Sequence, residues 1–229
     1  MSTFQGFPKD TVAFITELAA NNSKDWFEAN RDRYEESYRE PARAFVEAMA
    51  EPLATLSPEL NADPRNNGSI LRIHRDVRFS KDKSPYHTYL RIIFWQGAGK
   101  SKGKSGLYFG ISPGELFLGG GMHGFDPEQL KRYRSALENP AKSEALQKAI
   151  QKVKKAGHTL GEPHLKKIPN TIPADHPAPD LFRYKGLYAG IHSSLEPWLH
   201  GPEISDKVMD RFKTVRPLQA WLAAHVTLF

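Results

Sequence analysis

The apolar residues of this chain change their spacing twice along the sequence, and this change constrains the fold more than any other feature. Over roughly the first sixty residues they recur every three or four positions, as between Val12 and Leu18, which is typical of amphipathic helices. From Ser69 the pattern alternates with period two, as in strands. Helical spacing returns after Asp126. Helices, then antiparallel strands, then helices predict one α+β domain over residues 1–229, with a central antiparallel sheet flanked by N-terminal and C-terminal helices.

Proline and capping residues indicate where the helices begin and end. Pro8 opens the first helix, Ser23 is placed to cap the second, and Pro41 fits the first turn of the third. After the strands, Asp126 and the proline that follows it begin another helix. The C-terminal helical region is expected to divide near Pro217, because proline lacks the amide donor that a helix interior needs.

Residues 69–79 are predicted to form a strand with a break near Asp76, and the two faces of this strand differ sharply. The side chains expected to face the core are Leu71, Ile73, Val77 and Phe79. Those expected on the opposite face are Arg72, His74, Asp76 and Arg78. Arg75 falls on the apolar side, so either a β-bulge lies there or this arginine is buried and paired.

Further strands are predicted downstream. Residues 88–95 are rich in aromatic and branched side chains, and residues 186–191 form a later candidate strand. Residues 106–112 and 115–120 read as a hairpin, because Pro113 and Gly114 between them suit the central positions of a type II turn.

The composition excludes several classes of chemistry. The chain has no cysteine, which rules out disulfides, thiolate nucleophiles, cysteine-ligated zinc and iron–sulfur clusters. No apolar run is long enough to span a bilayer, and the first residues lack both the basic and the apolar part of a signal peptide. We therefore expect a cytoplasmic protein with no membrane partner.

Positive charge is concentrated in the middle of the chain. Lysine and arginine total 32 against 26 aspartates and glutamates, which gives a net charge of +6. Most of this excess lies in residues 72–91, whose basic members are Arg72, Arg75, Arg78, Lys81, Lys83 and Arg91. The acidic members of the same stretch are Asp76 and Asp82. Such a local excess indicates an anionic partner more strongly than the total charge does.

We interpret this basic stretch as a candidate anion site. Side chains on one face of a strand stand about 6.6 Å apart, here those of Arg72, His74, Asp76 and Arg78. Arginine offers a planar fork of donors suited to phosphate or carboxylate, and an aspartate between two arginines can orient them. The turn that follows can complete an anion cradle with its backbone amides and with Ser80, Lys81, Lys83 and Ser84.

Residues outside the basic stretch extend this candidate site. Asn30 and Arg31, in the second predicted helix, are placed to reach the strand face and complete a pocket. The alternative for Asn30 is that it caps a neighbouring backbone group. Tyr86 closes the basic stretch and is included as a ligand-binding candidate.

Two segments carry a resemblance to a known family. Residues 21–31, NNSKDWFEANR, and residues 75–86, RDVRFSKDKSPY, resemble the motifs of a bacterial and fungal family of conserved proteins of unknown function. The opening residues 4–7 and the spacing of residues 130–134 fit the same family. The resemblance implies a soluble, single α+β domain, and it carries over no activity, cofactor or catalytic residue.

Three functions are open at this point. The first is binding of a phosphate-bearing small molecule or of nucleic acid, with stacking on nearby aromatic side chains, namely Tyr86, Tyr89 and Trp95. The second is an enzyme, a phosphoester hydrolase or transferase, in which the arginines clamp the substrate and His74 or Asp76 acts as acid–base. The third is a structural Arg–Asp network with no ligand.

Neither a metal site nor a cofactor is indicated. None of the nine histidines is paired at metal-ligand spacing on an expected helix. Residues 119–124 match a dinucleotide-binding glycine pattern, but they follow a hairpin, so close backbone approach explains the glycines better. Nothing in the sequence indicates an oligomeric state.

Overall fold

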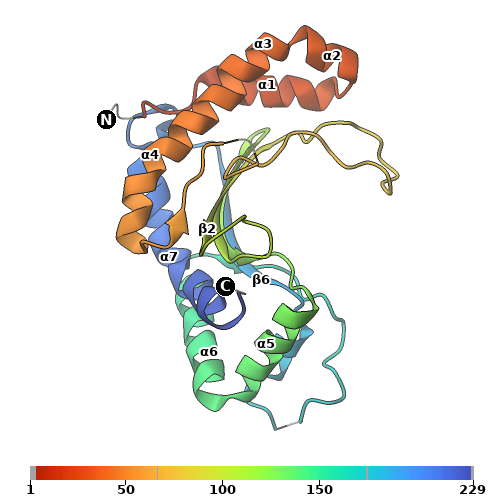
Figure 1. Ribbon diagram of the computed structural model, residues 1–229, viewed down its shortest axis with the longest axis vertical. Helices are drawn as coiled ribbons and strands as arrows, with labels where there is room; N and C mark the ends of the chain where they lie inside the picture. The colour runs from red at the N-terminus through yellow and green to blue at the C-terminus, as the bar shows by residue number, and fades with distance from the viewer. Residues whose placement is uncertain (1–3, 66, 174, 228–229) are drawn as a thin grey trace. The chain divides into compact units, whose positions relative to one another are not determined.

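Figure 1 shows the chain in the computed structural model, which describes residues 4–65, 67–173 and 175–227. The chain begins with α1 (Lys9–Ala20), α2 (Lys24–Ala29), α3 (Arg31–Tyr34), the π-helical turn η1 (Glu35–Arg39) and α4 (Glu40–Leu56). Its strands are β1 (Leu60–Asn61), β2 (Leu90–Gln96), β3 (Gly106–Ser112), β4 (Glu115–Met122), β5 (Thr159–Leu160) and β6 (Leu187–Ser194). The later helices are α5 (Pro127–Glu138), α6 (Pro140–Lys155), the 3₁₀ turns η2 (Pro179–Arg183) and η3 (Pro197–His200), and α7 (Ile204–His225).

The six strands form one antiparallel sheet in the order β1-β2-β3-β4-β6-β5. This confirms the α+β class with an antiparallel sheet. The predicted hairpin is present as β3 and β4, and Gly114 in its turn has a φ of 77°, a conformation that glycine adopts without strain.

The described chain divides into two compact units. Unit 1 is built from the described residues of Met1–Phe94, Tyr108–Leu118 and His192–Asp210. Unit 2 is built from those of Trp95–Leu107, Gly119–Ile191 and Arg211–Phe229. A single domain over the whole chain therefore stays a prediction, and each unit is described separately below.

The core of unit 1 is an aromatic cluster. Phe45 of α4 is fully buried, and its ring lies 5.4 Å from that of Phe7 and 4.9 Å from that of Phe109 on β3. Phe14 of α1 is buried as well and contacts Phe27 of α2. These rings join the N-terminal helices to the strand residues of the same unit, because aromatic side chains bury the most apolar area per residue.

The core of unit 2 combines aromatic packing with buried hydrogen bonds. Tyr133 of α5 is fully buried, and its hydroxyl donates to the Leu181 carbonyl at 3.0 Å. The Tyr133 ring meets the Trp221 ring of α7 edge to face at 6.2 Å. The Ser105 hydroxyl donates to the Gln219 carbonyl at 2.8 Å, so this buried polar group is satisfied.

The capping residues act as the sequence predicts. The Ser23 side chain accepts a hydrogen bond from the Trp26 amide at the start of α2. Asp126 and Gln129 form a reciprocal capping box at the start of α5. None of the described helices is both long and apolar enough to cross a bilayer.

The expected division of the C-terminal helix at Pro217 is wrong. The helix α7 continues through this proline from Ile204 to His225. Val215 and Leu218, on either side of it, are fully buried. Burial of the flanking turns offsets the hydrogen bond that proline removes, because tertiary packing supplies most of the stability of helices in proteins.

A buried histidine of unit 2 makes stability depend on pH. His158 is 3% exposed, and its Nε2 lies 2.7 Å from the Thr214 hydroxyl. The Thr214 hydroxyl donates its hydrogen to the Arg211 carbonyl. In the hydrogen bond between His158 and Thr214, Nε2 of His158 is therefore protonated and is the donor. The Nδ1 atom is buried with no hydrogen-bond partner. Burial, followed by the charge of Arg211, lowers the pKa of His158 to about 4.

We therefore expect acidification to destabilise the protein. The unfolded chain takes up a proton at a pKa near 6.5, whereas folded His158 does so at about 4. The stability that His158 contributes is complete above pH 6.5 and is lost as the pH falls toward 4, by about 3 kcal/mol. Urea unfolding at pH 7 and pH 4 measures this loss. His158→Gln, which keeps an amide donor near Thr214, should show a smaller difference, and an unchanged difference would contradict the assignment.

Candidate functional site

Residues 73–87 of the basic stretch form an extended loop of unit 1 that we call the arm, and Arg72 and Arg91 flank it. Its two sides are joined by backbone hydrogen bonds from Arg75 to Pro85 at 2.8 Å and from His87 to Ile73 at 2.7 Å. Figure 1 shows the arm as the long yellow loop. The prediction of a strand over residues 69–79 with a break near Asp76 is wrong, because only isolated bridges form at Ile70 and His74. Beyond the Arg75–Pro85 hydrogen bond the two sides are joined by side-chain contacts, such as that of Lys83 with the Val77 carbonyl, in place of a regular ladder.

Alternation of the side chains is nonetheless visible along the arm. The four residues expected on one face are all exposed, namely Arg72, His74, Asp76 and Arg78. Ile73 on the other face is buried at 3% exposure. Phe79, expected on that apolar face, is instead 96% exposed. Phe79 lies beyond the Arg75–Pro85 backbone hydrogen bond, and its side chain is uncovered at a position that the alternation predicts to be buried.

Two arginines of the arm already have carboxylate partners. Arg78 binds Asp76 through two hydrogen bonds of 3.0 and 2.8 Å, which hold the pKa of Asp76 below its usual value. Arg75 donates to Asp82 at 2.5 Å and to the Ser84 carbonyl at 3.0 Å. The Arg75 side chain is 22% exposed, so this arginine is paired, as one of the two accounts expects, but it is half-buried and not buried.

Local hydrogen bonds brace the turn of the arm. The hydroxyl and the amide of Ser84 donate to Asp82, and with Arg75 they lower the pKa of that carboxyl to about 2. The Lys83 ammonium donates to the Val77 carbonyl at 3.0 Å. The Ser80 amide donates to the same carbonyl at 3.3 Å. Lys83 and Ser80 therefore stabilise the turn in addition to any role toward a ligand.

Other cations near the arm have no carboxylate partner within the part of the chain that the structure describes. These are Arg72, Lys81 and Arg91. The Arg91 guanidinium lies over the ring of Tyr89, 4.5 Å from its centre, which is a cation–π contact. Arg72 and Arg91 are both exposed. Their charge is not neutralised by an ion pair within the described residues.

Tyr86 anchors the arm and does not present a free ring. The Asn22 side chain donates to the Tyr86 carbonyl at 2.9 Å and accepts from its amide at 3.1 Å. The Tyr86 ring stacks on Phe27 with centroids 4.2 Å apart and is 3% exposed. Trp95 is also buried, at 4% exposure. The expectation that Tyr86 and Trp95 stack on bases is therefore wrong.

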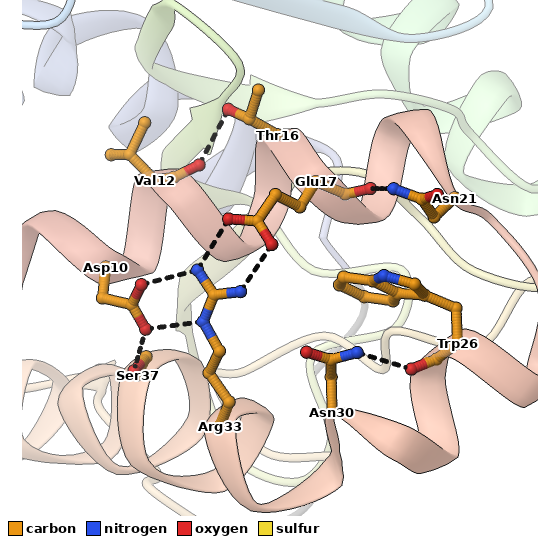
Figure 2. Close-up of polar contacts among 9 residues, drawn as sticks. All are labelled: Asp10, Val12, Thr16, Glu17, Asn21, Trp26, Asn30, Arg33 and Ser37. Carbon is orange, nitrogen blue, oxygen red and sulfur yellow. Dashed lines mark hydrogen bonds and ion pairs between the residues drawn. The ribbon is translucent and has the colours of Figure 1, made fainter.

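Asn30 and Arg31 bind within their own helical region. Figure 2 shows the Asn30 amide donating to the Trp26 carbonyl, at 2.9 Å, which is the backbone-capping alternative. Arg31 pairs with Glu28 at 2.9 Å on the surface. Neither residue lines the cavities described next.

Two cavities of unit 1 share His87 as a lining residue. The first, about 460 Å³, is lined by Ala19, Asn22, Arg75, Asp82, Ser84, Tyr86, His87, Thr88 and Tyr89. The second, about 340 Å³, is lined by Asn67, Leu71, Arg72, His87 and Arg91. Volumes of this order suit a small ligand. Arg72, Arg75 and Tyr86 are the predicted site residues that the cavities include.

The environment of His87 is positive. Burial, then the charges of Arg91, Arg75 and Arg72 in that order, lower the pKa of His87 to about 4. Its Nδ1 lies 2.6 Å from the Tyr89 hydroxyl, so the pair is hydrogen-bonded. At neutral pH the imidazole is uncharged and the three guanidinium groups carry the positive charge.

The sequence does not predict His87 as a site residue, because no spacing pattern links His87 to the other candidates. It lies after the motif and before the predicted strand, at a position with no periodic partner. His74, which the sequence does predict, packs against the Tyr86 ring at 5.2 Å, and no hydrogen bond or ion pair joins it to Asp76. Proximity to three arginines, which arises only in the folded chain, is what distinguishes His87.

A second charged cluster lies on the N-terminal helices and is structural. In Figure 2 the Arg33 guanidinium lies between two carboxylates of α1, and it binds Asp10 and Glu17 at 2.6 Å each. The Ser37 hydroxyl also donates to Asp10, at 2.6 Å. The hydrogen bonds of Arg33, then of Ser37, lower the pKa of Asp10 to about 2. This network fixes α1 against α3 and η1 with its charges matched.

No group of three or more metal-binding side chains occurs among the residues described. The glycines of residues 119–124 lie largely in β4, where Gly121 approaches the Leu187 carbonyl and Tyr188. Their expected place after the hairpin is wrong for Gly119, Gly120 and Gly121, because β4, the second strand of that hairpin, extends to Met122 and includes them. The close approach of Gly121 to β6 agrees with the explanation by backbone packing.

Fold and site together define an α+β protein with a cationic arm and a histidine surrounded by arginines. Residues 10–221 match the family described as conserved hypothetical protein (DUF2461), so the chain belongs to that family. The match includes the arm and both cavities. A comparison with curated proteins found no match.

Proposed function

We propose that this protein binds a phosphate-bearing ligand in the two cavities that meet at His87. The observation that carries the proposal is the convergence of Arg72, Arg75 and Arg91 on one uncharged imidazole. Arg72 and Arg91 form no ion pair with a carboxylate among the described residues, although the charge of Arg72 contributes to lowering the pKa of Asp76. Guanidinium groups without a carboxylate bind phosphate strongly, because each presents a planar fork of donors.

The cavity offers further donors beside the arginines. The hydroxyl groups of Ser84 and Thr88 belong to its lining, and the imidazole of His87 has a second nitrogen beyond the one bound to Tyr89. An anion held there would also raise the low pKa of His87, since opposite charges favour the protonated imidazole. Asp82 is the acidic lining residue, and its hydrogen bonds to Ser84 and Arg75 occupy it.

The structural Arg–Asp network accounts for part of the basic stretch. Arg78 pairs with Asp76 and Arg75 with Asp82, as that hypothesis expects. It does not account for Arg72 and Arg91, which is why the proposed ligand site centres on them. The proposal places the protein in the cytoplasm, where phosphate-bearing small molecules are its candidate partners.

Calorimetric titration with inorganic pyrophosphate and with a nucleoside monophosphate tests this proposal. Arg72→Gln and Arg91→Gln should each weaken binding about tenfold or more, because a charge-assisted hydrogen bond contributes about 1.5–3 kcal/mol. The double variant should show no measurable binding. Arg65→Gln is the matched control, since Arg65 is an exposed arginine outside both cavities.

Absence of binding by the unaltered protein, or equal binding by Arg91→Gln and Arg65→Gln, would refute the proposal. Release of inorganic phosphate from the nucleotide probe would favour the second function, a phosphoester hydrolase or transferase. The observation that favours this alternative is the hydrogen-bonded pair of His87 and Tyr89 in the cavity wall, where a base and a hydroxyl lie within transfer distance.

A further inference from the structure

The most exposed large apolar side chain described in the chain lies at the turn of the arm. Phe79 is 96% exposed, whereas Ile168, the other exposed large apolar residue among those described, is 36% exposed. The Phe79 ring lies beside the Arg78 guanidinium, 5.8 Å from the ring centre. A phenylalanine ring presented in this way has nearly its whole π surface open to a partner.

The backbone that carries Phe79 is held in place. On one side, Asp76 binds both the Arg78 side chain and the Arg78 amide. On the other, the Val77 carbonyl accepts from Lys83 and from the Ser80 amide. These contacts fix the turn without covering the ring. The turn is therefore ordered before any partner binds, and binding loses little further conformational entropy there.

The charge around Phe79 is positive. Arg78, Lys81 and Lys83 lie within four positions of it in the sequence and are exposed, and the Arg78 guanidinium lies beside the ring. Asp76 is engaged by Arg78, and Asp82 is engaged by Arg75 and Ser84. An aromatic ring among cations is complementary to a partner with flat rings and a negative backbone.

We propose that Phe79 is a base-stacking platform and that the ligand of this protein is single-stranded nucleic acid. This inference rests on the phosphate-binding function proposed above. Arg75, in the cavity wall, and Phe79, in the turn, belong to the same arm, and four extended residues span at most about 14 Å. A single-stranded nucleic acid with several phosphates can occupy the cavity and the turn at the same time, whereas a single phosphate can occupy only one of them.

Single strands fit these observations better than duplexes or membranes do. Stacking requires a base whose face is open, and bases in a duplex are stacked on each other. Stable membrane anchoring through apolar insertion takes more apolar surface than one ring supplies. The arm combines one exposed aromatic ring with an arginine-lined cavity at its base, which is the pattern of stacking plus backbone neutralisation.

Fluorescence anisotropy with a labelled twelve-nucleotide single strand, in DNA and RNA form, tests the inference. Phe79→Ala should weaken binding about 5- to 100-fold, the effect of losing one stacked base. Phe79→Trp should bind as the unaltered protein does, whereas Phe79→Leu should be as weak as Phe79→Ala, because leucine is apolar but has no π face. Ile168→Ala is the control for loss of an exposed apolar side chain and should change nothing.

Salt dependence separates the ring from the arginines. For a single strand, each phosphate that the protein no longer neutralises reduces the slope of log affinity against log salt by about 0.7. Arg72→Gln and Arg91→Gln should reduce this slope, and Phe79→Ala should leave it unchanged. Pyrophosphate binding should be equal in Phe79→Ala and the unaltered protein, which shows that the variant is folded and that its cavity is intact.

Several outcomes would overturn the inference. One is that the twelve-nucleotide strand binds no more tightly than a mononucleotide while pyrophosphate still binds. This result would support the phosphate site and refute the inference that the ligand is a nucleic-acid strand. Equal affinity for a duplex of the same length is another. Phe79→Leu binding like the unaltered protein, or Phe79-dependent sedimentation with phosphatidylserine–phosphatidylcholine vesicles in place of oligonucleotide binding, would assign Phe79 to apolar docking. Failure of pyrophosphate to bind would refute the proposed function directly.

Discussion

Replacing Phe45 by alanine should lower the free energy of unfolding by about 4 kcal/mol, because truncation of a buried phenylalanine removes apolar burial and leaves a cavity. The ring is fully buried in unit 1 and contacts the rings of Phe7, Phe94 and Phe109. Those neighbours come from different segments of the chain, so the structure cannot collapse into the gap by moving one side chain. Relaxation would require α4 to move against residues of β2 and β3.

Urea unfolding of the purified variant, followed by circular dichroism, measures this loss. Phe79→Ala is the matched control, because it makes the same chemical change at a position that is 96% exposed. It should change the free energy of unfolding by less than about 0.5 kcal/mol, as surface substitutions usually do. If the two variants differ by less than about 1 kcal/mol, the aromatic cluster does not stabilise unit 1 as described.

The helices and the hairpin could be predicted from the sequence because local chemistry specifies them. Ser23 and Asp126 accept hydrogen bonds from amides within their own helices, and Gly114 supplies the positive φ of its turn. No distant residue is needed for any of these features. Interactions of this kind can be read directly from the sequence.

The arm could not be predicted in the same way, because its conformation depends on distant residues. Alternation places Arg72 and Ile73 on opposite sides, and their exposure agrees with that. A strand, however, needs a partner that continues beside it, and period-two spacing does not show where that partner ends. Phe79 lies beyond the end of the pairing, so the rule that predicts its burial no longer applies.

The same limit applies to Pro217. Its cost to a helix is local and visible in the sequence, but the packing that offsets this cost is not. Val215 and Leu218 are buried by tertiary contacts that no spacing rule predicts. A local penalty of a few kcal/mol is outweighed where both flanking turns are buried.

The sequence predicts the types of residue in the candidate site better than it predicts how their side chains are arranged. The basic stretch does contain the arginines that surround the cavities, namely Arg72, Arg75 and Arg91. Which of the cations keep a carboxylate partner depends on side-chain geometry: Asp76 binds Arg78, two positions away, and Asp82 binds Arg75 across the arm. His87 and Asn22 belong to the site through contacts between distant parts of the chain, which residue spacing does not predict.

Replacing Gly121 by alanine should be as disruptive as removing a core ring. Its φ is 132°, in the region that residues with a side chain rarely adopt. A Cβ there would lie 2.4 Å from the Leu187 carbonyl oxygen and 2.6 Å from the Tyr188 Cα, and both are backbone atoms of β6. Backbone atoms cannot rotate away as a flexible side chain can, so β4 and β6 would have to separate at this point.

The expected loss for Gly121→Ala is about 4 kcal/mol, the sum of about 1–3 kcal/mol for a strained backbone and about 1–3 kcal/mol for overpacking. Gly124→Ala is the control, because a Cβ at Gly124 would have no heavy atom within 4 Å. Thermal unfolding of both variants should show a large decrease in Tm for Gly121→Ala and almost none for Gly124→Ala. A Gly121→Ala protein as stable as its control would mean that β4 and β6 do not approach as closely as the contacts of unit 2 require, and that the glycines of this stretch need an explanation other than backbone packing.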